Sequence, residues 1–402
     1  MKLIHKRTLS PPCLPHLPYT GMVKPHCIEC SSGSYVLRST SAGFLRHGVC
    51  VRSLLNHLKF YFLCLRLLVL PKNRQLVFGL SVNDKERRFL SAFAPDAIAI
   101  RANYFRGGFG FREHSARRKL TFIQRLLPSG TKTVVWGYRD HINLGFSFEE
   151  YFGEVTRIEA GLVPGPACER FLTSYIFSSK GMYFDGRQPS QLEEALNALT
   201  KGDIDRRLEN EKTIDTLVKR GVTKFSPLDS EAYLLEEGSV LIIGQVRGDQ
   251  ALTYTDTVCA TNTHLVEQVL SKTEWPETKR FYYKAHPKNK TNEREIADLQ
   301  YRFPELQIVP EKQNIIELLE QQPIVATITS GVGLEAALRG CVVHCYGVSF
   351  YSNWGFTVDH VSCSRRTNTL RPIDVAVELM IRQSVYVDPE TGHAVPLGTI
   401  YR

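Results

Sequence analysis

The chain has 402 residues, 43% of them hydrophobic, and can therefore bury the cores of two ordinary domains. Its net charge of +9 comes mainly from residues 1–70, where nine Lys and Arg face the single acid Glu29, so nucleic-acid binding by the nearly neutral remainder is disfavoured. The most apolar run, residues 60–70, is too short to cross a bilayer and contains Arg66, and we expect a soluble protein.

Residues 1–70 are predicted to form a basic leader with little fixed structure, because they contain a Pro pair, a Ser/Gly tract and no sustained hydrophobic period. They lack the apolar core and cleavage site of a secretory signal. His26 with Cys27 and Cys30 suggests zinc, but no second ligand pair follows at finger spacing. Alternatively, the leader is translated from an upstream start and belongs to no domain. The five cysteines beyond residue 70 are scattered, as is typical of reduced thiols in a cytosolic protein.

A first α/β domain is predicted over residues 75–235. Its expected elements are strands at 76–80, 97–100 and 132–137, a helix at 84–93, and amphipathic helices at 190–199 and 203–220. Between them, residues 101–125 are basic and rich in aromatics. This segment is either a solvated helix face or a surface for a phosphorylated glycolipid or an anionic membrane.

A second α/β domain is predicted over residues 238–370. Its expected strands are 239–244, 280–284, 306–309, 323–328 and 341–346, and its expected helices are 264–270, 292–301, 315–320 and 334–339. Strands alternate with helices in both halves, which predicts two doubly wound, Rossmann-like sheets. A last helix at 371–382 begins a C-terminal tail, residues 371–402.

The turn Ser330-Gly-Val-Gly333 joins a predicted strand to a predicted helix. Backbone N–H groups and the helix dipole converge at such a turn, so a nucleotide phosphate is its natural ligand. The alternative is a turn that uses glycine only for backbone freedom.

Two longer motifs include and follow this turn: T-S-x-x-G-x-E-A-x-L-R-G from Thr329 and Y-G-x-x-F-Y-x-x-W-G-x-T-x-D from Tyr346. Six other segments occur in a matching order: V-V-W-G at Val134, R-I-E-A-G at Arg157, G-M-Y-F-D at Gly181, Gly244-Gln245 with Asp249, K-A-H-P at Lys284 and Y-V-D-P-E-T-G at Tyr386. Over about residues 75–402, the chain resembles the capsule polysaccharide biosynthesis proteins of the KpsC type, which are bacterial β-Kdo transferases that use CMP-Kdo.

The resemblance implies a GT-B-like α/β fold, with two Rossmann-like domains facing across a cleft and a C-terminal tail that crosses back to the first domain. It implies CMP-Kdo as the donor and no cofactor. The donor has a single phosphate, which His, Lys and a helix N-terminus could hold, so we expect no metal.

Donor-binding residues follow from the same resemblance. His286, in the His-Pro pair after a strand, would contact the CMP phosphate, and Lys284 would add positive charge. Ser330 and Gly331 would donate hydrogen bonds to that phosphate. Glu335 could accept one from a ribose hydroxyl. For a lone histidine at a strand end, the alternative is a structural role.

The predicted catalytic pair is Glu159 and Asp249, one carboxylate from each domain, as nucleophile and acid/base of a retaining double displacement. Arg157-x-Glu159-x-Gly161 matches the family's R-x-E-D-G, but Ala160 replaces the second acid, which puts activity in doubt. Asp249 has the family's spacing from Gly244-Gln245, although a loop aspartate often only caps a turn. Arg157, Gln245, Tyr351 and Trp354 are expected to shape the pocket; buried packing is the alternative for the aromatics.

The leading hypothesis is therefore a transferase that adds β-Kdo from CMP-Kdo to a lipid-linked glycan acceptor in capsule synthesis. It would act in the cytoplasm of a Gram-negative bacterium, in peripheral contact with the inner face of the plasma membrane and with other capsule assembly proteins, and would bind no nucleic acid. One alternative is a non-catalytic relative with a degenerate site. Another is a transferase for a different CMP-linked ulosonic acid, such as a sialyltransferase.

Overall fold

The computed structural model describes residues 44–69, 77–80, 98–100, 113–127, 131–164, 173–205, 207–224, 232–271, 275 and 280–401. Residues from His47 onward form one compact unit. The predicted helix at 84–93, the possible zinc ligands and residues 101–112 lie outside the described residues. No helix in the described part of the chain combines the length and apolar character needed to span a bilayer.

A seven-stranded mixed sheet forms the first half of this unit, in the order β13-β12-β5-β4-β3-β1-β2. Strands β2, β1, β3 and β4 are mutually parallel, whereas β5, β12 and β13 pair antiparallel. Their bounds are β1 Val77–Leu80, β2 Ile98–Ile100, β3 Lys132–Trp136, β4 Val155–Ala160, β5 Ser174–Ser178, β12 Ser384–Val387 and β13 Ala394–Val395. The helices of this half are α3 Glu113–Leu126, α4 Arg139–Leu144, α5 Glu149–Phe152, α6 Gln191–Asn197, α7 Lys201–Asp205 and α8 Leu208–Lys219.

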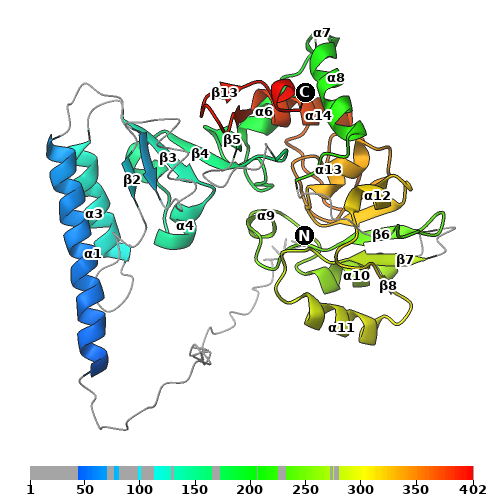
Figure 1. Ribbon diagram of the computed structural model, residues 1–402, viewed down its shortest axis with the longest axis horizontal. Helices are drawn as coiled ribbons and strands as arrows, with labels where there is room; N and C mark the ends of the chain where they lie inside the picture. The colour runs from blue at the N-terminus through cyan, green and yellow to red at the C-terminus, as the bar shows by residue number, and fades with distance from the viewer. Residues whose placement is uncertain are drawn as a thin grey trace, which may run out of the picture. The chain divides into compact units, whose positions relative to one another are not determined.

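One helix, α1 Phe44–Val69, lies within the predicted leader. Its buried residues Phe60, Leu63, Cys64 and Leu67 belong to the same core cluster as Leu120 of α3, so the two helices pack side by side (Figure 1). The expectation of little fixed structure up to residue 70 therefore does not hold for this segment. The segment forms an ordered helix because the apolar residues on one of its sides are buried against α3 and complete the core there.

A six-stranded, all-parallel sheet forms the second half, in the order β11-β10-β9-β6-β7-β8. Its strands are β6 Val240–Ile243, β7 Phe281–Lys284, β8 Gln307–Ile308, β9 Ile324–Thr327, β10 Val343–Cys345 and β11 Val358–Asp359. Its helices are α9 Gln250–Thr253, α10 Asn262–Leu270, α11 Asn292–Arg302, α12 Ile315–Leu319 and α13 Val332–Ala337. All four residues of β6 are apolar and buried, as expected for a central strand covered on both faces.

Successive residues of β6 contribute to opposite faces of this sheet. Val240 and Ile242 share a core cluster with residues of α10 and α11, whereas Leu241 and Ile243 share one with residues of α12 and α13. Figure 1 shows these helix pairs on opposite sides of the sheet. Because all six strands are parallel, every loop that follows a strand lies at the same edge of the sheet, where binding sites form in such folds.

The tail returns from the second half to the first. Helix α14 Pro372–Ala376 continues as a π-helix over Val377–Arg382, and β12 then pairs with β5 of the first sheet. A buried ion pair between Arg207 and Glu378, 2.9 Å long, anchors the π-helix to the start of α8. The last short helix is α15 Leu397–Ile400. The tail thus contributes the last two strands at one end of a sheet that begins some 300 residues earlier in the chain, and β13 is the edge strand there.

Candidate active site

A cavity of about 520 Å³ lies between the two halves, at the carboxyl ends of β6, β7 and β9. This volume is in the usual range for small-molecule sites. Eight of the sequence-predicted site residues line it: Glu159, Gln245, Asp249, Lys284, His286, Ser330, Gly331 and Glu335. Arg157, Tyr351 and Trp354 do not line it. The two sheets therefore bring together residues that are separated by up to 176 positions in the chain.

The turn after β9 is fixed by a hydrogen bond from the side chain of Tyr351. Its hydroxyl donates a hydrogen bond of 2.6 Å to the Ser330 carbonyl, and the ring is fully buried. The Ser330 amide donates to Thr327 Oγ1 at 3.1 Å, and Ser330 Oγ accepts from the amide of Val332 at 3.4 Å. Tyr351 was predicted to shape the pocket, but it does not line the cavity. It instead fixes the backbone that carries Ser330.

Positive charge gathers at the end of β7. The Lys284 ammonium donates to the Glu311 carbonyl at 3.0 Å, and burial lowers the pKa of Lys284 to about 8, while Glu311 opposes this shift. Burial also lowers the pKa of His286, although Asp249 opposes this. The Lys288 amide donates to His286 Nδ1 at 3.1 Å, so the neutral ring carries its proton on Nε2, where it can act as a donor.

Asp249 is both a helix cap and a cavity residue. Its Oδ1 accepts from the Ala251 amide at 3.1 Å, which begins α9, and Gln245 Nε2 lies 3.3 Å from Oδ2. Gln245 is buried and its amide group also bonds the Thr329 side chain at 2.9 Å. The carboxylate is thus held between the loops that follow β6 and β9.

Glu159 enters the cavity from β4. Its Oε1 accepts from Trp136 Nε1 at 3.1 Å and from the Ala160 amide at 3.0 Å. Ala160 itself packs against a separate apolar cluster that contains Trp136, Ile158 and Tyr175, and it does not line the cavity. Successive residues of a strand point to opposite faces, so the acid that the family motif has at this position would not share the side of Glu159.

Tyr183 is a cavity residue that the sequence reasoning did not select. The ring is buried, and its pKa lies far above the ordinary value because of burial, followed by the charges of Glu159 and Asp249. Both predicted carboxylates therefore act on one phenol. The signal that could have identified it is its place in the G-M-Y-F-D segment.

Glu335 is hydrogen-bonded to Thr223 in the segment after α8. Sequence reasoning did not identify this segment as part of the site. Both carboxylate oxygens accept from Thr223 Oγ1 at 3.0 Å, and burial raises the pKa of Glu335 while the Thr223 bond opposes that shift. Lys224, next to Thr223, lines the cavity and lowers the pKa of His286. The positive charges of three lysines (Lys224, Lys284 and Lys288) thus all lower the pKa of His286 at this end of the cavity.

The predicted pocket role of Arg157 is not supported by its position. Its guanidinium is buried and binds Asp140 at 2.9 Å, Glu149 at 2.7 Å and the Gly137 carbonyl at 2.7 Å. The cation also lies 4.6 Å from the ring centroid of Tyr138. Arg157 therefore organises the loop after β3 rather than contacting a ligand in the cavity, because the buried carboxylate of Asp140 needs a paired cation.

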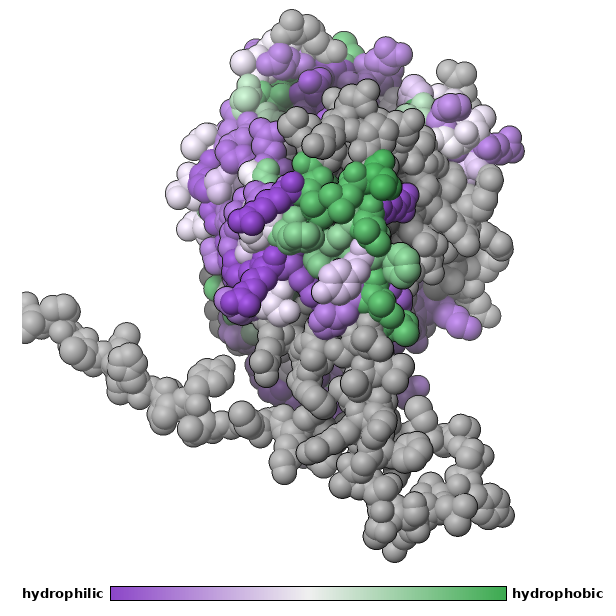
Figure 2. Space-filling model, turned by 90° about the vertical axis from the view of Figure 1, so that its left-hand side faces the viewer, coloured by the Kyte–Doolittle hydropathy of each residue, from purple (hydrophilic) through white to green (hydrophobic). Residues whose placement is uncertain are grey.

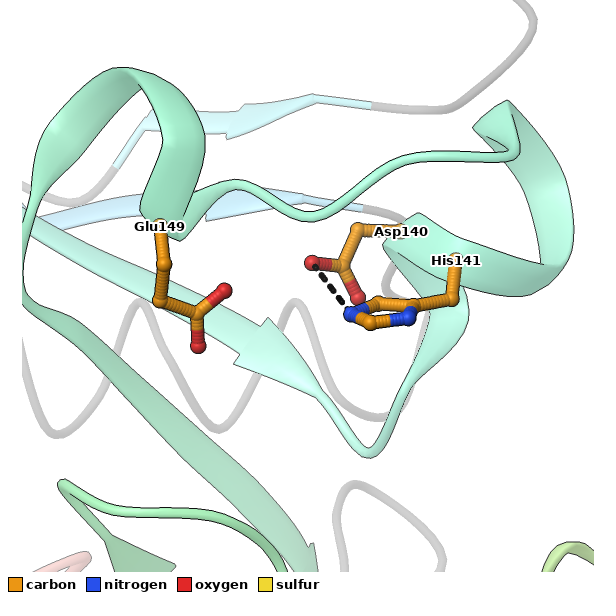
Figure 3. A group of neighbouring side chains, drawn as sticks. All are labelled: Asp140, His141 and Glu149. Atoms are coloured by element: carbon orange, nitrogen blue, oxygen red, sulfur yellow. Dashed lines mark ion pairs between the residues drawn. The ribbon is translucent and has the colours of Figure 1, made fainter. Parts of the chain in front are cut away.

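Asp140, His141 and Glu149 bring potential metal-ligand atoms within 4.8 Å of one another (Figure 3). The two carboxylates already receive the Arg157 guanidinium, and His141 Nε2 lies 3.9 Å from Asp140 Oδ2. Arginine supplies the positive charge that a metal would bring, so this group is accounted for without an ion.

Trp354 is likewise a core residue. It is fully buried, its Nε1 donates to the Phe350 carbonyl at 3.2 Å, and Arg366 lies 5.3 Å from its ring centroid. The packing alternative of the sequence prediction applies to this aromatic. Phe350, four residues earlier, lines the cavity instead.

Comparison with known proteins places these features in context. Residues 218–387 match the family model described as capsule polysaccharide biosynthesis protein. The chain is 25% identical over 295 residues to the capsule polysaccharide modification protein LipA of Neisseria meningitidis serogroup B, covering 71% of this chain and 40% of LipA. It is 28% identical over 207 residues to the lipopolysaccharide-processing protein LpsZ of Rhizobium meliloti, covering 48% of this chain and 45% of LpsZ. The chain therefore spans less than half the length of these relatives.

Two solved structures share the fold. They are KpsC proteins of Thermosulfurimonas dismutans, a β-Kdo 2,7 transferase with a TM-score of 0.62 and 21% identity, and a β-Kdo 2,4 transferase with a TM-score of 0.60 and 20% identity. The matches cover 81% and 82% of this chain and 97% and 98% of those chains. The predicted fold, two Rossmann-like domains across a cleft as in GT-B glycosyltransferases, is confirmed.

Proposed function

We propose that this chain, a capsule polysaccharide protein of the KpsC type, transfers Kdo from CMP-Kdo to a lipid-linked glycan acceptor. The observation that supports this most is the meeting of Glu159 and Asp249, from the two halves of the unit, around Tyr183 in one cavity. Two carboxylates at one site are the minimum that a double displacement at a sugar carbon requires.

The donor phosphate would lie among Lys284, His286 and Lys224, with Ser330 Oγ at the same end of the cavity. A lysine with a pKa of about 8 is mostly charged at neutral pH, and the His286 ring can donate from Nε2 without carrying a charge. As the bond to the sugar breaks, these groups stabilise the negative charge that develops on the leaving CMP.

The reaction would proceed in two steps, each a displacement at the anomeric carbon. One of the carboxylates Glu159 and Asp249 attacks the anomeric carbon, the bond to the phosphate oxygen breaks, and CMP leaves with the electron pair. The other carboxylate then takes the proton of the acceptor hydroxyl, whose oxygen attacks the same carbon and releases the enzyme carboxylate. Tyr183, buried beside both groups, would hold its proton throughout because its pKa is far above neutral.

The test is to incubate the purified chain with CMP-Kdo and a Kdo-primed lipid analogue and to measure the mass of the acceptor. The proposal expects an increase of one Kdo and release of CMP. Intact-protein mass spectrometry of Glu159→Gln and Asp249→Asn then distinguishes the two roles. The variant that lacks the acid/base accumulates a Kdo adduct, whereas the variant that lacks the nucleophile forms none. Release of CMP without glycosylated acceptor or adduct in any form would contradict the proposal.

A second candidate is a non-catalytic relative that keeps the donor site for capsule assembly, and the observation that favours it is Ala160 in place of an acid. Binding of CMP with no transfer from any CMP-linked ulosonic acid would support this candidate. Transfer from CMP-linked sialic acid but not from CMP-Kdo would instead support the sialyltransferase alternative. The proposed transfer of Kdo would take place at the inner face of the plasma membrane, together with other capsule assembly proteins.

A further inference from the structure

Helix α1 exposes a stripe of large apolar side chains on the side that faces away from α3. Seven of them are 46–81% exposed: Leu55, Leu58, Tyr61, Phe62, Leu65, Leu68 and Val69. They recur at steps of three and four residues, so they lie along one side of the helix over about 21 Å. Figure 2 shows hydrophobic side chains gathered on this face of the molecule.

This apolar stripe is separate from the residues that fold the helix onto the protein. Phe60, Leu63, Cys64 and Leu67 are buried against α3, so the core of this region is complete without the stripe. Scattered exposed apolar residues are ordinary, but seven contiguous ones on a single helix indicate a surface that another apolar phase covers.

The charged side chains that the structure describes on α1 and α3 are all of one sign. Exposed Lys59 and Arg66 belong to α1, and exposed Arg118 and Arg125 belong to α3, where Phe122 extends the apolar surface. Among residues 55–69 and 114–126, whose side chains the structure describes, none is acidic. A second copy of the chain would therefore bring like charges together if two such faces met around a two-fold axis. An anionic phospholipid surface matches both features, because it offers an acyl layer and negative headgroups.

We propose that α1 docks the protein on an anionic phospholipid bilayer, with the apolar stripe inserted at the headgroup boundary and the basic residues of α1 and α3 against the headgroups. This interaction goes beyond the transfer reaction. It would hold the cavity near a membrane, where lipid-linked acceptors are found, but a soluble acceptor analogue can be glycosylated without it.

The experiment is vesicle flotation of the full chain with phosphatidylcholine alone and with an equal mixture of phosphatidylcholine and phosphatidylglycerol. The double variant Phe62→Ser/Leu65→Ser removes two exposed apolar side chains without touching the core. Tyr301→Ser is the matched control, because this residue is an equally large, exposed aromatic on α11 in the second half. Lys59→Glu/Arg66→Glu tests the charge component.

The wild type and Tyr301→Ser should float with the anionic vesicles, and Phe62→Ser/Leu65→Ser should bind them at least about tenfold more weakly. The charge-reversal variant should lose the preference for anionic over neutral vesicles, and raised salt should weaken wild-type binding. Equal flotation of all four proteins would overturn the proposal. So would a wild type that does not float but forms a dimer that Phe62→Ser/Leu65→Ser dissociates, because the stripe would then be an interface between copies.

Discussion

The hydroxyl group of Tyr351 lies so close to Gly333 that a Cβ on Gly333 would be 2.1 Å from Tyr351 Oη and 2.4 Å from the ring carbon Cζ. Both atoms are fully buried, and the same hydroxyl holds the Ser330 carbonyl. The second glycine of the S-G-x-G turn is therefore required by close packing and not by a positive φ.

Gly333→Ala should accordingly destabilise the protein by about 1–3 kcal/mol, the usual cost of overpacking, and should weaken CMP binding because Ser330 moves with Tyr351. Gly331→Ala is the matched control, since no atom lies within 4 Å of its Cβ position and its φ is −58°. Urea denaturation of both variants measures the difference. Equal stability would show that Tyr351 yields at little cost.

The donor contacts can be tested separately from catalysis. His286→Ala and Ser330→Ala should each reduce the rise in melting temperature that CMP produces, because hydrogen bonds to a charged group contribute about 1.5–3 kcal/mol. Thr253→Ala serves as the control, because Thr253 is the exposed last residue of α9 and does not line the cavity. Unchanged CMP stabilisation in both cavity variants would mean that the phosphate binds elsewhere.

The buried Lys284 predicts a pH dependence with opposite effects on binding and stability. Its pKa is lowered from 10.5 to about 8, so the unfolded chain binds a proton that the folded chain has released between these values. Wild-type stability relative to Lys284→Met should therefore increase as the pH rises through this window. CMP affinity should fall over the same range, because the neutral amine no longer attracts the phosphate. Calorimetric titration of CMP into the wild type at several pH values tests the predicted loss of affinity. A CMP affinity that stays constant across this pH window would contradict it.

Helix α1 should contribute to stability through one side only. Leu67→Ala removes a buried side chain and should cost about 2–5 kcal/mol in its region, whereas the neighbouring Leu65→Ala should change stability little, because Leu65 is 58% exposed. Hydrogen exchange of α3 in the two variants reports the local effect. Equal protection in both would indicate that α1 does not stabilise α3.

The parallel strands were predictable because each is a short apolar run bounded by turn residues, and β6 and β9 lie within the expected ranges. Helix α1 was missed because apolar residues occupy both its buried and its exposed sides. With apolar residues on both sides, the helix lacks the polar period that reveals a surface helix, and its most apolar run is too short to indicate a membrane span. Residues 84–93, predicted helical, lie outside the described residues and remain a prediction.

The site was predictable where residues lie in the loops that follow strands, as His286 does after β7 and Asp249 does after β6. Motifs alone could not separate ligand contacts from supports. Arg157 is two residues from Glu159 in one motif, yet it is committed to Asp140 and Glu149. The G-M-Y-F-D segment marks Tyr183 as a residue of interest, but its position beside two carboxylates is a property of the fold, which brings Glu159 and Asp249 together.

Ala160→Asp tests the meaning of the altered motif. Because the Ala160 side chain packs with Trp136 and Tyr175 and not in the cavity, the added carboxylate should lower stability and leave transfer activity no higher than in the wild type. Ala160→Ser, of nearly the same size, controls for packing. Creation of activity by Ala160→Asp in an otherwise inert protein would reassign the catalytic acid and favour the non-catalytic candidate.

The most direct test is transfer from CMP-Kdo to a Kdo-primed lipid analogue, measured by acceptor mass for the wild type, Glu159→Gln and Asp249→Asn. Both substitutions keep shape, and asparagine still caps α9 in place of Asp249. The account predicts glycosylated acceptor from the wild type and a loss of at least about a thousandfold in each variant, with CMP stabilisation retained. Wild-type protein that binds CMP but transfers nothing, or variants that transfer at the wild-type rate, would contradict it.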